Sequence, residues 1–132
     1  MYHPTDGSDY EFLEFKNTSM FTTNISGWYL TSAVYCAAFP EGTELAPGEY
    51  FVVASDADSY TSKYGSAPDF HYEGHLNNAG DTVTVCNASA VSVLSVPYDD
   101  HSPWPEDADG NGFSLVIIDP DASATNPTNS ED

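Results

Sequence analysis

The clearest chemical signal in the sequence is an acidic loop near the C-terminus with the spacing of a calcium loop. Asp107, Asp109 and Asn111 place oxygen-bearing side chains at alternate positions, and a glycine follows where the chain has to turn. This is the first half of the pattern D-x-[DN]-x-[DN]-G, whose carboxylate and amide oxygens suit the hard Ca²⁺ ion. The second half is missing, because Ile118 stands where the pattern requires a bidentate glutamate. Carboxylates nearby would have to complete the site: Asp99, Asp100, Glu106 and Asp119.

The same loop also has a purely structural explanation. Asp109 and Asn111 can accept hydrogen bonds from backbone N–H groups of a tight turn. Gly110 and Gly112 can then adopt the positive φ that such a turn needs. The sequence therefore leaves two hypotheses for these residues, a calcium site and a hydrogen-bonded turn.

Catalytic chemistry finds little support in the sequence. His71, Glu73 and His75 follow the order H-x-E-x-H, whereas the zinc-protease helix requires H-E-x-x-H. On a strand the two imidazoles would lie about 13 Å apart, too far to share an ion. There is no G-x-S-x-G element for a nucleophilic serine either. We therefore expect no enzymatic activity and no required cofactor.

The two cysteines, Cys36 and Cys86, both fall on predicted strands. In an exported domain, a disulfide between them would close a long loop and contribute about 3–4 kcal/mol. The other possibility is two free thiols, because alternation that turns Val83 and Val85 toward the core turns Cys86 outward. The sequence leaves the bridge open.

Two aromatic residues are candidates for stacking on a ligand. Trp104 lies between two prolines, and Tyr98 precedes the acidic pair at residues 99 and 100. Exposed rings of this kind stack on sugar rings in many binding modules, so both could serve a glycan. The alternative is that Trp104 covers the core and that the tyrosine rings are half-buried at sheet edges, with their hydroxyl groups exposed to solvent.

The charge balance excludes several kinds of partner. The chain has 21 acidic residues and two basic ones, Lys16 and Lys63, for a net charge of -19. Nucleic-acid binding requires many Lys and Arg side chains at phosphates, so we expect no nucleic-acid partner. We also expect no membrane insertion, since anionic lipids would repel the chain and no apolar run approaches the roughly 18 residues of a span. The scarcity of lysine and arginine is better explained by adaptation to high salt than by calcium binding.

The pattern of the elements predicts an all-β protein. Short alternating or β-rich segments are bounded by turn residues, and no helical apolar period persists. We expect strands at residues 11–15, 25–30, 34–39, 49–54, 70–76, 82–86, 91–96 and 113–118. A turn at residues 46–49 leads into the fourth strand, one helical turn is expected at 60–64, and the sixth and seventh strands form a hairpin. About eight short antiparallel strands are typical of an immunoglobulin-like β-sandwich.

The chain divides into one domain and a tail. Its hydrophobic share of 40% and aromatic share of 14% are ample for a core, so the high charge does not indicate disorder. We place the β-sandwich at residues 1–119 and a small, polar tail or linker at residues 120–132. No signal peptide is recognisable, so an exported parent protein would contain this chain as a piece.

Several motifs in order resemble the lamin-tail domain, in particular its bacterial and archaeal branch. Residues 1–4 resemble the end of that branch's first strand, and residues 11–17 its E-F-I-E-L-x-N strand. Residues 25–28 resemble L-S-G-W, and residues 39–54 resemble F-P-x-G-T-x-L-x-P-G-x-Y-x-V-V-A. Residues 74–81 resemble G-x-L-S-N-x-G-E, and residues 98–115 resemble Y-D-D…P-W-P…A-D-G-x-G-x-S-L. Each motif is weak alone, but together they are specific.

The resemblance implies a non-catalytic module with an immunoglobulin-like fold. Members of this branch occur in exported multidomain proteins, where the domain is thought to bind, attach or space its neighbours. We therefore expect an extracellular or cell-surface location, a monomer, and an unknown protein or glycan partner. A carbohydrate-binding module that uses exposed aromatic rings is the alternative function.

Overall fold

The computed structural model describes residues 1–102, 104, 109 and 110 of the chain. Eight strands, one α-helix and one 3-10 turn make up this described part. The strands are β1 (Phe12–Lys16), β2 (Thr23–Asn24), β3 (Tyr29–Ser32), β4 (Glu44–Leu45), β5 (Tyr50–Ala54), β6 (Phe70–His71), β7 (Gly80–Cys86) and β8 (Ser92–Asp99). The helix is α1 (Ala57–Tyr64), and the 3-10 turn spans Ser8–Tyr10. The helix is too short to cross a membrane.

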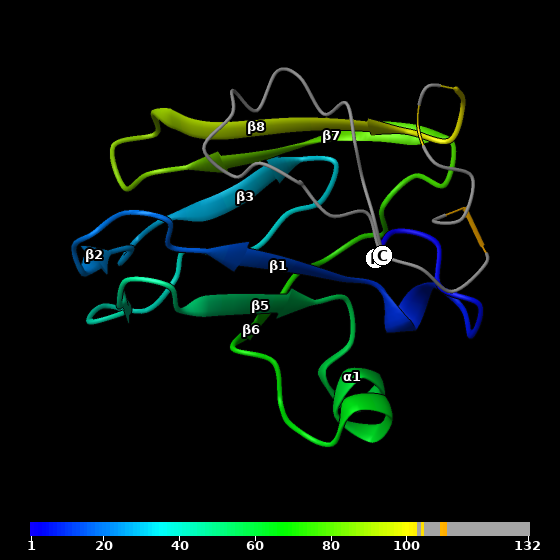
Figure 1. Cartoon of the computed structure of the whole chain (residues 1–132), viewed down its shortest axis with the longest axis horizontal. Coiled ribbons are helices and arrows are strands. Elements are labelled where there is room, and N and C mark those ends of the chain that lie inside the picture. The colour runs from blue at the N-terminus through cyan, green and yellow to red at the C-terminus, as the bar shows by residue number, and fades with distance from the viewer. Residues whose placement is uncertain (103, 105–108, 111–132) are drawn as a thin grey trace.

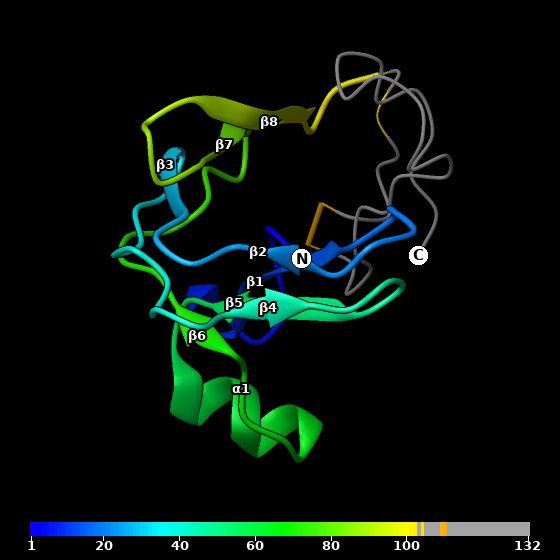
Figure 2. The ribbon, with the colours of Figure 1, turned by 90° about the vertical axis from the view of Figure 1, so that its left-hand side faces the viewer.

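The strands form two layers with the core between them (Figures 1 and 2). One layer is the sheet β1-β5-β6, beside which β2 and β4 form a short ribbon; the other is the sheet β3-β7-β8. Helix α1 lies on the outer side of the first layer (Figure 2). This arrangement confirms the predicted all-β sandwich, with one difference: β5 and β6 pair in parallel, whereas the other strand pairs are antiparallel.

Local sequence signals predicted the regular strands well. Strand β5 and the turn before it are confirmed, with Glu49 N donating to Ala46 O at 3.0 Å and Gly48 at a φ of 77°. The hairpin of β7 and β8 is also confirmed. The helix is longer than the single turn we expected, because the Asp56 carboxylate caps its N-terminus through Ser59 N and Gly65 ends it in the left-handed region.

The predicted strand at residues 34–39 is wrong. Ser32 has a φ of 77°, which ends β3 and turns the chain back. The segment then divides its backbone hydrogen bonds between separate partners, since Tyr35 bridges Glu73 and Phe39 N donates to Trp28 O. The strand expected at residues 70–76 likewise shortens to β6, and the one at 25–30 begins only at residue 29. The strand expected at 113–118 and the tail at 120–132 lie outside the described residues.

Both cysteines are free, buried thiols in the structure, so the possible bridge is not formed. Cys36 Sγ accepts a hydrogen bond from Leu30 N at 3.1 Å, and burial raises the pKa of this thiol. Cys86 is buried as well, although it is not a member of the core cluster that contains Val83 and Val85. The register of β7 against β8 shifts between Val85 and Cys86, since Val85 pairs with Leu94 and Cys86 with Ser92, so the extra residue of this bulge is Val93 on β8.

The core also contains a carboxylate, that of Glu11 just before β1, which is only 1% exposed. Its Oε2 accepts hydrogen bonds from Leu76 N at 2.9 Å and from the Tyr72 hydroxyl at 3.2 Å, and His75 Nδ1 lies 3.7 Å away. Burial raises the pKa of Glu11, and the Leu76 amide and the charge of His75 offset part of that rise. Glu11 thereby connects the beginning of β1 to residues 72–76, which lead from β6 to β7.

We predict that Glu11→Ala lowers the free energy of unfolding by about 3 kcal/mol or more, because two buried donors lose their acceptor at about 1–3 kcal/mol each. The matched control is Glu14→Ala, which removes an exposed glutamate on β1 and should change stability by less than about 0.5 kcal/mol. Urea unfolding of both variants measures the difference. Equal losses in the two variants would contradict a structural role for the buried carboxylate.

Candidate functional site

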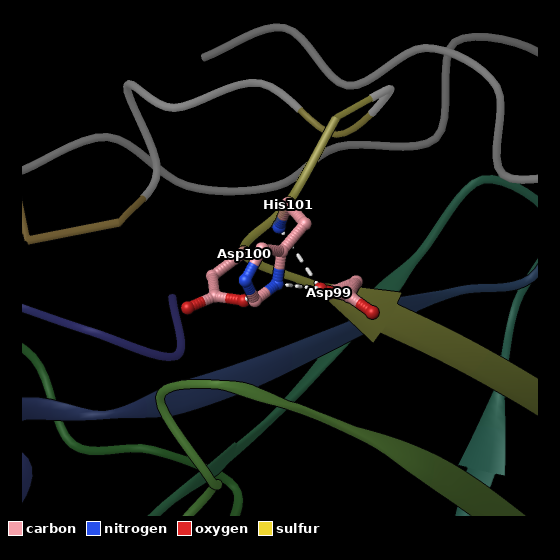
Figure 3. Close-up of side chains that lie close together, drawn as sticks. All are labelled: Asp99, Asp100 and His101. Atoms are coloured by element: carbon pink, nitrogen blue, oxygen red, sulfur yellow. Dashed lines mark hydrogen bonds and ion pairs between the residues drawn. The ribbon is translucent and has the colours of Figure 1, made fainter.

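The end of β8 gathers two of the predicted metal ligands with a histidine (Figure 3). Asp99 is the last residue of β8, and one ligand atom from each of Asp99, Asp100 and His101 lies within 4.8 Å of the others. His101 Nδ1 is 2.9 Å from Asp99 Oδ1 and 2.5 Å from Asp100 Oδ1. The His101 backbone N–H also donates to Asp99 Oδ1 at 2.9 Å. The strand end thus holds a compact group of one imidazole and two carboxylates, which we call the Asp-Asp-His cluster.

The neighbouring strand places this cluster through a close backbone approach. Gly80, the first residue of β7, pairs with Asp99, and its φ is 115°. A Cβ atom at Gly80 would lie 2.8 Å from Tyr98 O and 3.0 Å from Asp99 Cα. Only glycine therefore allows β7 and β8 to meet in this way just before the cluster.

Hydrogen bonding and charge shift the protonation of the cluster. The backbone N–H and the imidazole of His101 lower the pKa of Asp99. In turn, the hydrogen bond with Asp99 and the negative charge of Asp100 raise the pKa of His101 above its ordinary value of 6.5. The imidazolium is therefore the form that the two carboxylates stabilise, and it is lost as the pH rises through this raised pKa.

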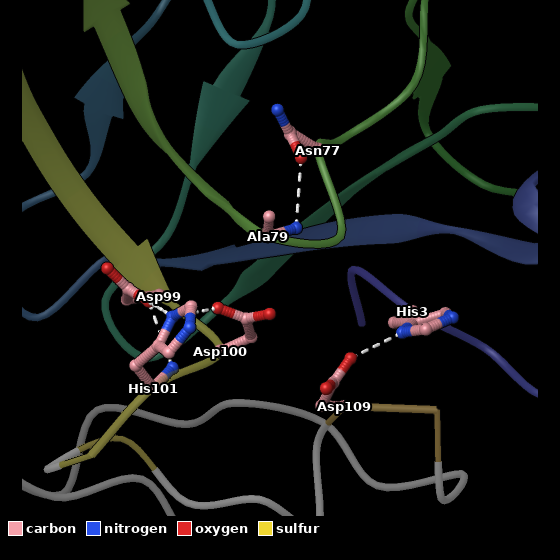
Figure 4. Close-up of polar contacts among 7 residues, drawn as sticks. All are labelled: His3, Asn77, Ala79, Asp99, Asp100, His101 and Asp109. Atoms are coloured by element: carbon pink, nitrogen blue, oxygen red, sulfur yellow. Dashed lines mark hydrogen bonds and ion pairs between the residues drawn. The ribbon is translucent and has the colours of Figure 1, made fainter.

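Asp109, the third predicted ligand that the structure describes, lies apart from the cluster (Figure 4). It pairs with His3 across a distance of 2.6 Å between Asp109 Oδ1 and His3 Nδ1. Gly110 follows with a φ of 79°, as the turn hypothesis expects. The remaining predicted ligands, Asp107 and Asn111, lie outside the described residues. Among the described residues, the structure thus brings together Asp99 and Asp100 and leaves Asp109 with His3.

The two predicted stacking residues have different environments. Tyr98 is buried at 8% exposure, packs on the Tyr2 ring at 4.8 Å and donates its hydroxyl hydrogen bond to Asn77 O at 2.8 Å. It cannot act as an exposed platform, so this prediction is wrong. Trp104 is half-buried and packs against the core, which favours its interpretation as a cover for the core.

Sequence reasoning missed the partners of two histidines. His3 and His101 showed no partner in the sequence, yet each contacts an aspartate. For His101 a signal was present, because Asp-Asp-His is contiguous at residues 99–101. For His3 there was none, since Asp109 is 106 positions away along the chain.

Comparison with family models and with curated proteins gives one match. A family model described as Lamin Tail Domain matches residues 1–100. No curated protein matches the chain. The matched region includes all eight described strands and ends within the cluster, at Asp100.

We predict that Asp99→Asn lowers the pKa of His101 toward 6.5, because the variant loses the carboxylate that contributes most to the shift. NMR titration of the His101 ring protons, with a chelator present, measures this pKa. The control is Asp58→Asn, which removes one exposed carboxylate on α1 and should leave the titration unchanged. A downward shift of the same size in both variants would show that only the overall charge matters.

Proposed function

The chain belongs to the lamin tail domain family, and from this premise we propose that it is a non-catalytic binding or spacer module of an exported, cell-surface or extracellular multidomain protein. The observation that carries the proposal is the family match over residues 1–100 together with the two-layer sandwich. The family fold is immunoglobulin-like, and its members are in general structural or interaction domains. Such modules act through their surface, so the partner has to be inferred from what this surface offers.

The surface favours partners other than polyanions. Both lysines of the chain are engaged internally: Lys63 Nζ lies 2.5 Å from Asp6 Oδ2 and 5.4 Å from the centre of the Tyr10 ring, and Lys16 lies over the Tyr50 ring at 5.5 Å. A chain with a net charge of -19 and no arginine has no further fixed cations to offer. We therefore propose a protein or neutral glycan partner and no nucleic acid.

A glycan is the second candidate partner, and one surface feature favours it. A shallow hollow of about 80 Å³ is lined by Tyr35, Cys36, Ala37, Phe70, His71 and Glu73. The Tyr35 ring is 58% exposed at its rim, and His71 stacks on Phe70 with ring centres 5.6 Å apart. An exposed ring beside a carboxylate and an imidazole can stack on a sugar and bind its hydroxyl groups.

Affinity electrophoresis against neutral polysaccharides separates the two candidates. A spacer or protein-binding module should migrate without retardation in every gel. Retardation that Tyr35→Ala abolishes, and that Tyr50→Ala on β5 leaves intact, would establish the glycan partner instead. Tyr50 is a matched control, because its ring is also exposed, at 52%.

The acidity supports a salt-rich environment for the parent protein. We predict that raising sodium chloride from about 0.1 M to about 1 M increases the melting temperature at pH 7 by about 5 °C or more. The reason is that the Debye length shortens from about 10 Å to about 3 Å, which weakens the repulsion between carboxylates. The control is the same experiment near the sequence pI of 4.1, where little net charge remains. A rise of the same size at both pH values would contradict charge screening as the cause.

We also propose calcium binding at residues 107–111, which the same thermal unfolding experiments can test. At matched ionic strength, calcium should then add a further rise over sodium, and Asp109→Asn should remove that addition. A melting temperature that depends on ionic strength alone would leave the turn hypothesis for this loop.

A further inference from the structure

The carboxylates of Asp99 and Asp100 converge on a single nitrogen atom (Figure 3). His101 Nδ1 carries one proton at most, and its hydrogen bond goes to Asp99 Oδ1 at 2.9 Å. Asp100 Oδ1 lies even closer, at 2.5 Å, yet it is buried and has no hydrogen-bond partner among the described residues. One proton between two carboxylate oxygens therefore leaves the second oxygen without the donor that a buried acceptor requires.

A second buried polar group belongs to Tyr2, whose ring packs on the last part of β8. Tyr2 is only 3% exposed, and in the described part of the chain its hydroxyl has no hydrogen-bond partner. After burial, the charges of Asp109, Asp100 and Asp99 are the causes that raise its pKa to about 12, so the hydroxyl lies within electrostatic reach of all three. Its ring packs on Tyr98, the residue before Asp99. A buried hydroxyl of this kind requires a hydrogen-bond partner, which an ordered water at this end of β8 would supply.

We propose that the Asp-Asp-His cluster binds one divalent metal ion of the zinc class, meaning Zn²⁺ and the neighbouring ions that accept imidazole nitrogen. The ion takes the place of the proton on His101 Nδ1, which is released to solvent. One nitrogen and two carboxylate oxygens then supply three ligands, and a water completes the tetrahedral set that zinc prefers. The Tyr2 hydroxyl is the buried group that can hydrogen-bond to this water.

The donor atoms favour zinc over calcium. Calcium takes six to eight oxygen ligands, whereas the central atom of this cluster is a nitrogen. A doubly charged ion also neutralises both carboxylates at once, which a singly charged imidazolium cannot do. The His101 backbone N–H on Asp99 Oδ1 holds that carboxylate in place, as outer hydrogen bonds do in metal sites.

This site goes beyond the proposed function, because a binding or spacer module does not require it. The net charge of -19 raises the local concentration of cations at the surface and so favours loading. His101 itself is 80% exposed in its side chain, so an ion can reach the cluster from solvent.

The test is a Zn²⁺ titration of the full chain in competition with a chromophoric chelator. We expect one Zn²⁺ per chain, and we expect His101→Gln and Asp100→Asn each to weaken binding at least about tenfold. His71→Gln is the matched control, because it removes an exposed histidine outside the cluster, and it should bind within about twofold of the unchanged chain. His101 is exposed, so its variant keeps the fold, and circular dichroism without metal checks this for both cluster variants.

Three results would overturn the proposal. The first is equal Zn²⁺ affinity in the unchanged chain and in His101→Gln. The second is a loss in His71→Gln as large as that in His101→Gln, which would place the ion at another histidine. The third is displacement of Zn²⁺ by calcium at equal concentration, which would indicate an oxygen-only site. None of these results bears on the proposed module function, which polysaccharide binding tests separately.

Discussion

The buried carboxylate of Glu11 is the constraint on which the rest of this sandwich depends. A charge-bearing group with 1% exposure needs donors in the core, and here they come from Tyr72 and the amide of Leu76. Residue 77 follows at once, and its carbonyl accepts the Tyr98 hydroxyl. Tyr98 leads directly into the Asp-Asp-His cluster, so a continuous series of hydrogen bonds and chain connections joins the first strand to the end of the last described one.

The distribution of charge explains how so acidic a chain folds as a module. Most carboxylates lie in exposed or half-buried positions, where salt and water reduce their repulsion. The two lysines each contact an aromatic ring and add to the packing of strands and helix. The charged groups on the surface are therefore almost all anionic, and among the described residues the Asp-Asp-His cluster is the one group of three potential metal ligands. An immunoglobulin-like module with this surface is compatible with the proposed binding or spacer role.

The sequence predicted those parts of the structure that short-range rules determine. The proline and glycine of the turn at residues 46–49 and the alternation in β7 are such cases, because turn geometry and the pleat depend on adjacent residues. The all-β class followed from the pattern of short segments and turn residues, and the family followed from motifs in order. Residues 34–39 have the composition of a strand, but they do not pair along a single neighbouring strand. Their backbone hydrogen bonds instead go to Trp28 and Glu73, which belong to different segments. The burial of Glu11 and the pairing of His3 with Asp109 depend on residues distant in the chain, and no local pattern encodes them.

The most direct measurement for this account is an NMR pH titration of the side-chain carboxyl carbon of Glu11, with Glu11 labelled in the full chain. Burial should raise its pKa above the ordinary value of 4.5, and the resonance should titrate together with the Leu76 amide that donates to it. Between 4.5 and the raised pKa the folded chain then holds more protons than the unfolded one, so this group's contribution to stability decreases as the pH rises. A pKa at or below 4.5, or a Leu76 amide that does not respond, would contradict the central place of the buried carboxylate.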